Sequence, residues 1–142
     1  MRIREAKRED YDDIVSTWEA SGLSYRPNGR DSRESISGEL AGGHSVFLVA
    51  EERGKIVAVA FGTHDGRKGW INRLAVRPEL RRQGIARQLV KELEQRFEAR
   101  GIHIVTCLIE GWNEASQAFF AEIGYIRHED IVYFSKRGFP DV

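Results

Sequence analysis

The sequence predicts a mixed α/β domain around a twisted, mostly antiparallel sheet, and three observations support this prediction. The chain has 142 residues, close to the commonest length of one compact domain, so we expect a single domain over residues 1–142. Two apolar runs, residues 46–50 and 56–61, are joined across Arg53-Gly54 and indicate a β-hairpin. Residues 85–100 place apolar side chains at helical spacing, which indicates an amphipathic helix after the strands.

The other elements follow from the same periodicities. Helical spacing of apolar residues predicts a helix over residues 10–20, which Gly22 ends. Residues 25–31 are the least regular part of the chain and indicate a loop. We also expect a short strand from Ile3, a second short helix after Ser32, strands over about 70–76 and 102–109, and a last strand that contains Tyr133.

Composition and charge exclude several classes of protein. No apolar run approaches the ~20 residues that a membrane-spanning helix needs. The charged start of the chain lacks an apolar secretion segment, so we expect a cytoplasmic protein with no membrane partner. Lys and Arg together number 22, as do Asp and Glu, and this zero net charge argues against nucleic acid. One cysteine and four scattered histidines predict neither a disulfide framework nor a metal site.

The strongest local feature is an arginine-rich turn before the helix at 85–100. Five arginines crowd this region, with Glu79 the only acid among them: Arg73, Arg77, Arg81, Arg82 and Arg87. Each cation near a helix N-terminus destabilises the helix by roughly 0.3–1 kcal/mol. A polyanion bound at the turn would make the same positive charges favourable. Gly84 would allow the close backbone approach that a phosphate needs. The alternative is a solvated basic turn before an amphipathic helix.

The motifs around this turn resemble the GNAT N-acetyltransferase superfamily, and small stand-alone bacterial members of the YpeA type in particular. The family's phosphate loop, [QR]-x-x-G-x-[GA], is matched by Arg81-Arg82-Gln83-Gly84-Ile85-Ala86. Residues 74–78 are similar to the family's bulged strand. Downstream, Asn113, Ser116, Phe119-Phe120 and Gly124-Tyr125 resemble the family's N-x-x-A-x-x-F-Y-x-x-x-G-F.

The resemblance implies a GNAT fold, with six to seven strands, about four helices and a splay between the fourth and fifth strands, here 70–76 and 102–109. Acetyl-CoA would lie in that splay as cosubstrate, with no metal. Its pantetheine arm would pair with the backbone of Leu74, Ala75 and Val76, and its phosphates would bind Arg81, Arg82, Gln83, Gly84, Ile85, Ala86 and Arg87. Asn113, Ser116 and Phe119 would complete the cofactor site, although Asn113 also suits a helix N-cap and Phe119 a core position.

Two catalytic positions of the family are changed in this chain. The family's glutamate on the central strand falls near Asn72, which cannot accept a proton, so Glu110 is the candidate base unless it is simply a solvated carboxylate. The family's proton-donating tyrosine is Phe120, which leaves Tyr133, or else Tyr125, as the candidate acid. A core or hairpin role is the alternative for both tyrosines.

The implied activity is transfer of the acetyl group to a primary amine by direct attack in a ternary complex. The acceptor, a small molecule or a protein amine, would enter beside the first two helices and the loop at 25–31. Cys107 could carry the acetyl group, but its position in an apolar strand favours a small buried residue. A non-catalytic acyl-CoA-binding module is the alternative function, and a homodimer is left open.

Overall fold

The computed structural model describes residues 1–140 and 142. The chain divides into two compact units, Met1–Cys107 and Leu108–Val142, and each is described here by itself. That one domain spans residues 1–142 stays a prediction.

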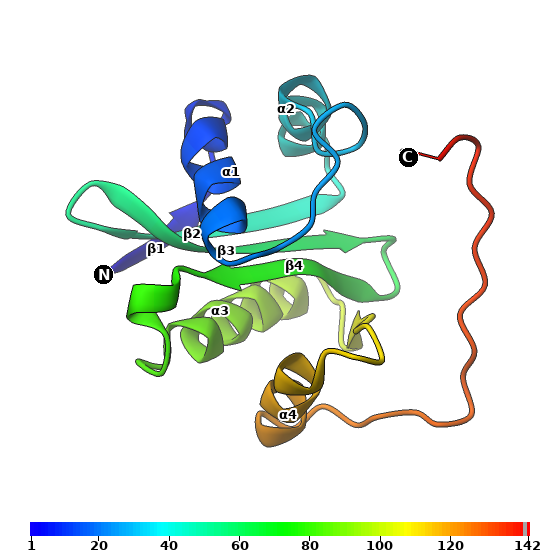
Figure 1. The fold of residues 1–142 in the computed structure, drawn as a ribbon. Helices are drawn as coiled ribbons and strands as arrows, with labels where there is room; N and C mark the ends of the chain where they lie inside the picture. The colour runs from blue at the N-terminus through cyan, green and yellow to red at the C-terminus, as the bar shows by residue number, and fades with distance from the viewer. Residues whose placement is uncertain (141) are drawn as a thin grey trace. The chain divides into compact units, whose positions relative to one another are not determined.

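The first unit contains a five-stranded sheet in the order β1-β2-β3-β4-β5 (Figure 1). The strands are β1 (Arg2–Glu5), β2 (Ser45–Glu52), β3 (Lys55–His64), β4 (Gly69–Val76) and β5 (Val105–Cys107). All neighbours are antiparallel except β4 and β5, which are parallel. The mixed α/β class is confirmed, but the expected count of six to seven strands is too high for the described residues.

The hairpin between β2 and β3 forms where the sequence predicts it. Glu52 pairs with Lys55, so Arg53 and Gly54 make a two-residue turn. Their φ angles, 53° and 75°, are both left-handed, as a type I′ turn requires. Gly54 meets this requirement without steric cost.

Helices cover both faces of the sheet in the first unit. Helices α1 (Tyr11–Ala20) and α2 (Arg33–Ala41) lie on one face and α3 (Ile85–Ala99) lies on the other (Figure 1). Short 3₁₀ turns, η1 (Arg8–Asp10) and η2 (Pro78–Leu80), precede α1 and the arginine-rich turn. The predicted helix after Ser32 is confirmed, and the Ser32 side chain caps it by accepting a hydrogen bond from the N–H of Ser35.

Helix α3 packs unusually close to the sheet because two strand positions are glycine. A Cβ atom at Gly62 would lie 2.8 Å from the Phe97 ring, and one at Gly69 would lie 2.7 Å from it. Phe97 is itself fully buried. Any side chain at either position would therefore push α3 away from β3 and β4.

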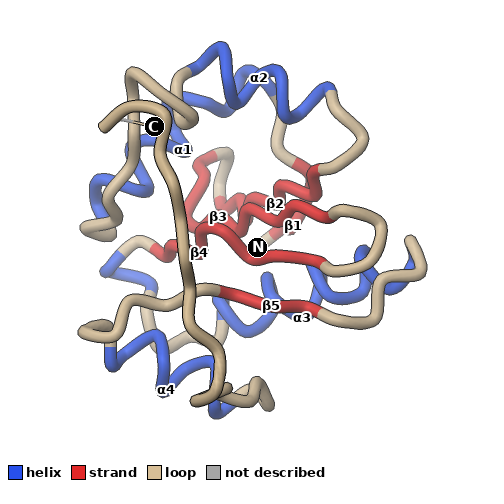
Figure 2. The backbone as a smooth tube through the Cα atoms, turned by 90° about the vertical axis from the view of Figure 1, so that its right-hand side faces the viewer, coloured by secondary structure: helices blue, strands red, loops and turns tan. Residues whose placement is uncertain are grey.

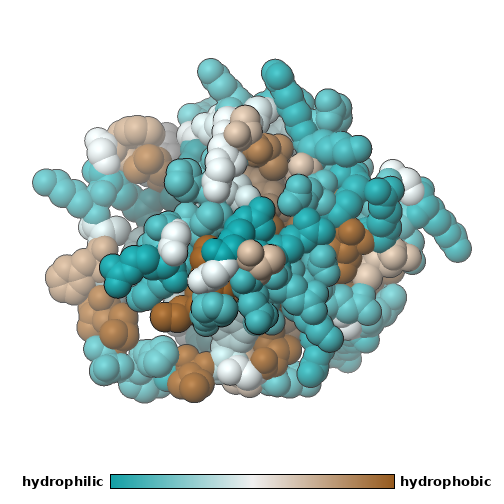
Figure 3. Space-filling model, turned by 180° about the vertical axis from the view of Figure 1, so that it is seen from behind, coloured by the Kyte–Doolittle hydropathy of each residue, from teal (hydrophilic) through white to brown (hydrophobic). Residues whose placement is uncertain are grey.

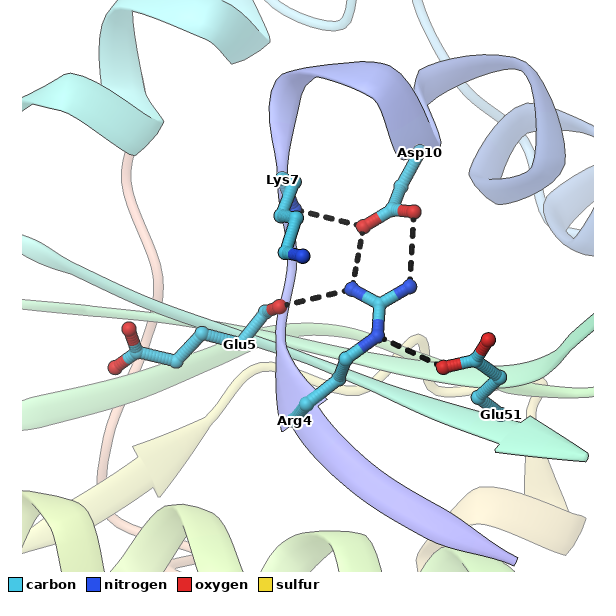
Figure 4. Close-up of polar contacts among 5 residues, drawn as sticks. All are labelled: Arg4, Glu5, Lys7, Asp10 and Glu51. Carbon is cyan, nitrogen blue, oxygen red and sulfur yellow. Dashed lines mark hydrogen bonds and ion pairs between the residues drawn. The ribbon is translucent and has the colours of Figure 1, made fainter. Parts of the chain in front are cut away.

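Strand β1 is tied to its surroundings by a polar network around Arg4 (Figure 4). Its guanidinium pairs with Asp10 at 2.7 Å and with Glu51 of β2 at 2.9 Å. Asp10 also accepts a hydrogen bond of 2.7 Å from the N–H of Lys7. The hydrogen bond from Arg4, aided by the one from Lys7, lowers the pKa of the Asp10 carboxyl below its usual value.

Strands β4 and β5 are paired over only three residues. The pairs are Gly69↔Val105, Trp70↔Thr106 and Ile71↔Cys107, and β4 then continues to Val76. Among the described residues, no strand pairs with residues 72–76 on the β5 side. The unpaired part of β4 begins where the splay is predicted, and the strand expected over 102–109 is reduced to the short segment Val105–Cys107.

Asn72 is the extra residue of a β-bulge. Phe61 pairs with Arg73 and Gly62 pairs with Ile71, so Asn72 has no partner residue in β3. The bulge lies where the pairing of β4 with β5 stops. It allows the consecutive side chains of Asn72 and Arg73 to contact groups on the same side of the sheet as α1 and α2.

The second unit contains α4 (Glu114–Glu122) followed by a segment drawn as loop (Figure 2). The side-chain oxygen of Asn113 caps α4 by accepting a hydrogen bond from the N–H of Ser116. The prediction that Tyr133 lies on a strand is wrong, because none of the described residues around Tyr133 pairs with another strand. The Tyr133 residue is instead 65% exposed.

Hydrophilic residues cover much of the surface seen in Figure 3. Over residues 1–140 and 142, no helix combines the length and the apolar composition needed to cross a membrane.

Candidate functional site: an arginine-rich turn beside a splayed strand

The arginine-rich turn places a series of backbone N–H groups at the start of α3. Arg82 and Gly84 have left-handed φ angles of 65° and 77°, which bend the chain sharply between η2 and the helix. The N–H groups of residues 82–87 donate no hydrogen bond to any described residue. The first turn of α3 also contains no acid. These free donors and the helix dipole together favour an anion at this turn.

Three arginines supply positive charge at the turn. Arg81, Arg82 and Arg87 are all exposed. Arg81 donates a hydrogen bond of 3.3 Å to the carbonyl of Ser21, which leaves most of its guanidinium accessible. Gln83 is also exposed, whereas Ile85 is buried against the sheet and Ala86 is half-buried. The loop thus has an accessible polar side and a buried apolar anchor.

The other two arginines of the predicted cluster have structural roles. Arg77 is only 7% exposed and donates to the carbonyl of Ile56 at 3.0 Å and to the Ser16 hydroxyl at 3.1 Å. These bonds join the end of β4 to β3 and α1. The sequence could not distinguish Arg77 from the accessible arginines, because the groups that accept its hydrogen bonds lie far from it in the chain.

Arg73 ties β4 to the loop before α2. Its guanidinium forms an ion pair of 2.5 Å with Asp31, donates to the carbonyl of Ser24 and lies 5.0 Å from the centre of the Trp18 ring. Burial lowers the pKa of Arg73 below its usual value, and Asp31 acts in the opposite direction. Asp31 also accepts a hydrogen bond of 2.7 Å from the N–H of Arg26, so the loop predicted to be irregular is anchored.

The splayed half of β4 presents a backbone edge. Leu74, Ala75 and Val76 pair with Ala60, Val59 and Ala58 of β3 on one side. On the other side, no described strand takes up their remaining N–H and C=O groups. An extended ligand with amide groups could add to this edge as a strand does.

A hollow of about 470 Å³ lies near α2, on the side of the sheet that α1 and α2 cover. Its lining residues come from the loop before α2, α2 itself, the connection from α2 to β2, and the strands β2 and β3: Arg30, Ser35, Gly38, Glu39, Gly42, His44, Ser45 and Thr63. Thr63 connects the hollow to the bulge, because its hydroxyl accepts a hydrogen bond of 2.8 Å from the Asn72 amide.

Sequence reasoning did not single out Glu39, the one carboxylate among these lining residues. Glu39 is exposed as a whole residue, but partial desolvation of its carboxyl, and then the nearby charge of Asp31, raises its pKa above the usual value. One signal was available: Glu39 lies in the last turn of α2, where the helix dipole disfavours an acid.

The remaining candidate residues lie in the second unit. The Glu110 residue is exposed in a turn, where its carbonyl accepts hydrogen bonds from the Asn113 N–H at 2.9 Å and the Gln117 amide at 3.2 Å. Asn113 therefore has the N-cap role that its residue type allows, with its side-chain NH₂ still available to a ligand. Ser116 contributes its N–H to that cap.

The two phenylalanines of α4 are buried to different degrees. Phe119 is half-buried, whereas Phe120 is only 7% exposed. The Phe120 ring packs edge-on against the rings of Phe119 and Tyr125, each with a centroid distance of 5.1 Å. Phe120 therefore fills the core position, whereas Phe119, for which the sequence allows a core position, is only half-buried.

Two other chemistries receive no support from the described residues. Burial raises the pKa of the Cys107 thiol to about 11, so little of the reactive thiolate would form near neutral pH. No group of three or more His, Cys, Asp or Glu side chains in residues 1–140 and 142 is arranged to hold a metal ion.

The chain belongs to the acetyltransferase (GNAT) family, whose model matches residues 5–125. Members of this family share the acyl-transfer chemistry for which it is named. A curated relative, Acetyltransferase plu1384 from Photorhabdus laumondii subsp. laumondii, is 34% identical over 138 residues, covering 96% of this chain and 95% of that protein. The closer resemblance to the YpeA type stays a prediction.

Solved structures show the same fold. The PaiA N-acetyltransferase from Thermoplasma acidophilum, in complex with coenzyme A, has a TM-score of 0.77 and 18% identity, covering 87% of each chain. The aminoglycoside acetyltransferase AAC(6')-Iy, in complex with the bisubstrate analogue CoA-S-monomethyl-acetylneamine, has a TM-score of 0.80 and 16% identity, covering 96% of this chain and 97% of that one.

Proposed function

We propose that this chain is an N-acetyltransferase that passes the acetyl group of acetyl-CoA to a primary amine by direct attack in a ternary complex. The observation that carries the proposal is that two features occur together in the first unit. Free N–H donors with exposed arginines lie at the start of α3, and an unpaired backbone edge lies on residues 72–76 of β4. Both features suit coenzyme A, which joins phosphates to an amide-containing arm.

The phosphates would bind at the turn. Residues 82–87 would donate backbone N–H groups, and Arg81, Arg82 and Arg87 would add charge. The pantetheine amides would hydrogen-bond the backbone of Leu74, Ala75 and Val76. Asn113, Ser116 and Phe119 are proposed as further contacts, on the strength of the resemblance. Solved structures of the same fold bind coenzyme A, which supports this proposal.

The reaction forms one bond and breaks another. The neutral amine nitrogen attacks the thioester carbon, the C–S bond breaks, the nitrogen loses a proton, and the thiolate of CoA gains one. A lysine-like amine is only about one part in 2,500 neutral at pH 7, a cost of roughly 4.6 kcal/mol. A proton acceptor or a desolvating pocket must therefore offset part of this cost.

Glu110 is proposed as the proton acceptor and Tyr133 as the proton donor. Asn72 cannot accept a proton, and its amide already donates to Thr63. Phe120 cannot donate one. Direct attack needs no covalent enzyme intermediate, and the high pKa of Cys107 supports this route over transfer through its thiol.

A non-catalytic acyl-CoA-binding module is the second candidate. The observation that favours it is the replacement of the family's base and acid by Asn72 and Phe120. Such a module would bind acetyl-CoA but leave the thioester intact in the presence of amines.

The deciding experiment incubates the protein with acetyl-CoA and a panel of amines and detects free CoA thiol. Acetylated product, identified by mass spectrometry, supports the enzyme. Acetyl-CoA binding without thiol release for any amine would replace the enzyme with the binding module. Gly84→Glu serves as the site-directed blank, since its side chain would enter the proposed phosphate site.

A further inference from the structure

The hollow near α2 has two opposite charges on its wall. Glu39 is the one carboxylate among its lining residues, and Arg30 is the one guanidinium. The other lining residues are His44, three with side-chain hydroxyls and two glycines, of which His44 and the hydroxyls can take part in hydrogen bonds. A ligand in the hollow would therefore face one anion and one cation.

These two charges act on each other but are not paired. Both residues are exposed, and the charge of Arg30 acts to lower the pKa of Glu39. Among the described residues, however, neither side chain forms an ion pair or hydrogen bond. Glu39 also experiences partial desolvation of its carboxyl and the charge of Asp31, which raise its pKa, and the charge of Arg73, which lowers it. Both side chains are thus free to bind a ligand.

The hollow is connected to the place where the acetyl group is expected. Thr63 lines the hollow and accepts the hydrogen bond from Asn72. Asn72 is the first residue of β4 beyond its last pair with β5, Ile71↔Cys107, so the splay opens there. An acceptor in the hollow would lie against the same bulge as the thioester of a cofactor paired with residues 74–76.

We infer that the hollow takes an acceptor carrying both an amine and a carboxylate, with Glu39 binding the amine and Arg30 the carboxylate. This inference rests on the proposed N-acetylation and narrows its substrate class to amino acids and short peptides. A volume of about 470 Å³ is within the range of small-ligand sites and suits a molecule of that size. Arg30 would disfavour acceptors that carry several cations and no anion.

The test compares acceptors that differ only in the carboxylate. Alanine and alanylalanine are each compared with their C-terminal amides, with kcat/KM measured by CoA release for the parent, Arg30→Ala and Glu39→Gln. We expect Arg30→Ala to lower kcat/KM at least tenfold for the free acids and less than twofold for the amides, as loss of a charged hydrogen bond predicts. Glu39→Gln should lower it at least tenfold for acids and amides alike. Each ratio is taken for one acceptor, so differences in amine pKa cancel.

Two nearby variants act as controls. Arg26→Ala changes the same loop as Arg30, and Glu34→Gln changes the same helix as Glu39, but neither residue lines the hollow. Both controls should keep the parent's kcat/KM, and KM for acetyl-CoA should be unchanged in all four variants. Equal losses for acids and amides in Arg30→Ala, or no loss in Glu39→Gln, would overturn the inference.

Failure of the inference can be separated from failure of the proposed function. Calorimetric titration of alanylalanine and its amide into the protein saturated with CoA measures acceptor binding without turnover. Dipeptide binding that depends on Arg30 would support the hollow even if no amine is acetylated. Turnover of simple alkylamines with no preference for the free acids would support the enzyme and overturn the inference.

Discussion

Asn72 and Thr63 are joined by a hydrogen bond of 2.8 Å from the side-chain amide of one to the hydroxyl of the other. Asn72 is the bulge residue of β4, and Thr63 lies near the end of β3. The bond fixes the orientation of an amide at the position where the family's catalytic carboxylate is expected. This chain therefore has a neutral amide there, with one N–H already donated to Thr63, and the proton acceptor of the proposed reaction would be another residue or water.

Gly84→Glu should abolish acetyl-CoA binding, with at least a hundredfold increase in Kd by isothermal titration. The new carboxylate would lie among the N–H donors of residues 82–87 and would repel phosphate. The control is Gly54→Glu, because Gly54 has nearly the same left-handed φ, 75° against 77°, and equally open surroundings. Comparable losses of affinity in both variants would show that backbone strain, and not the phosphate site, is responsible.

Arg81→Ala combined with Arg82→Ala should weaken phosphate-rich ligands most. We expect at least a tenfold rise in Kd for acetyl-CoA, a smaller rise for acetyl-dephospho-CoA and almost none for acetyl-pantetheine, because the arginines act through charge. Arg2→Ala, an exposed arginine on β1, is the control. The same loss for all three ligands would favour the solvated-turn interpretation.

Glu110→Gln should lower kcat/KM mainly at pH values below the pKa of the amine, where deprotonation limits the reaction. The pH–rate profile of the variant is compared with that of the parent and of Glu114→Gln, an exposed acid in the first turn of α4. If the profiles of Glu110→Gln and the parent coincide, Glu110 is not the base.

Phe120→Tyr should raise kcat without tightening acetyl-CoA binding. An alkyl thiolate costs only about 2 kcal/mol to expel unprotonated at pH 7, so the parent should turn over slowly but measurably. A positioned acid typically contributes 10²–10⁴-fold to the rate, and water can supply part of this contribution.

Tyr133→Phe in the parent should lower kcat at least tenfold if that tyrosine is the acid. An unchanged kcat would exclude Tyr133 as the acid.

Asp10→Asn should destabilise the protein near neutral pH by about 1–2 kcal/mol, since the carboxylate accepts charged hydrogen bonds from Arg4. The folded-state pKa of Asp10 is lowered, so this stabilisation is present above the unfolded pKa of about 3.9 and is lost as the pH falls through the folded value. Denaturant unfolding at pH 7 and pH 3 measures the free energy of unfolding of the parent and of the variant. The difference between the two should be smaller at pH 3. Glu9→Gln, at the neighbouring position, should show little effect at either pH, and an undiminished gap for Asp10→Asn at pH 3 would contradict the assignment.

Local patterns in the sequence predicted the parts of the fold that local interactions determine. The turn at Arg53-Gly54, the helix after Ser32 and the helix after Gly84 each depend on residues within a few positions of one another. The strand at Tyr133 could not be excluded from the sequence, because a strand exists only where another strand pairs with it.

Long-range contacts explain most of what the sequence could not predict about the site. Arg73 and Arg77 look like Arg81 in the sequence, but their partners Asp31 and Ile56 lie 42 and 21 positions away. Glu39 could be identified only from the structure, where it lines the hollow together with residues of β2 and β3. Charge spacing alone could not separate arginines that hold the fold from those that face solvent.

The glycines at positions 62 and 69 determine how closely α3 lies against the sheet. They let the Phe97 ring rest almost on the sheet backbone, and Phe97 belongs to the helix whose first turn carries the phosphate loop. The height of α3 above the sheet therefore sets the span between that loop and the edge of β4. A side chain at either glycine would move α3 and so change the distance that the proposed coenzyme A has to span between the loop and the strand.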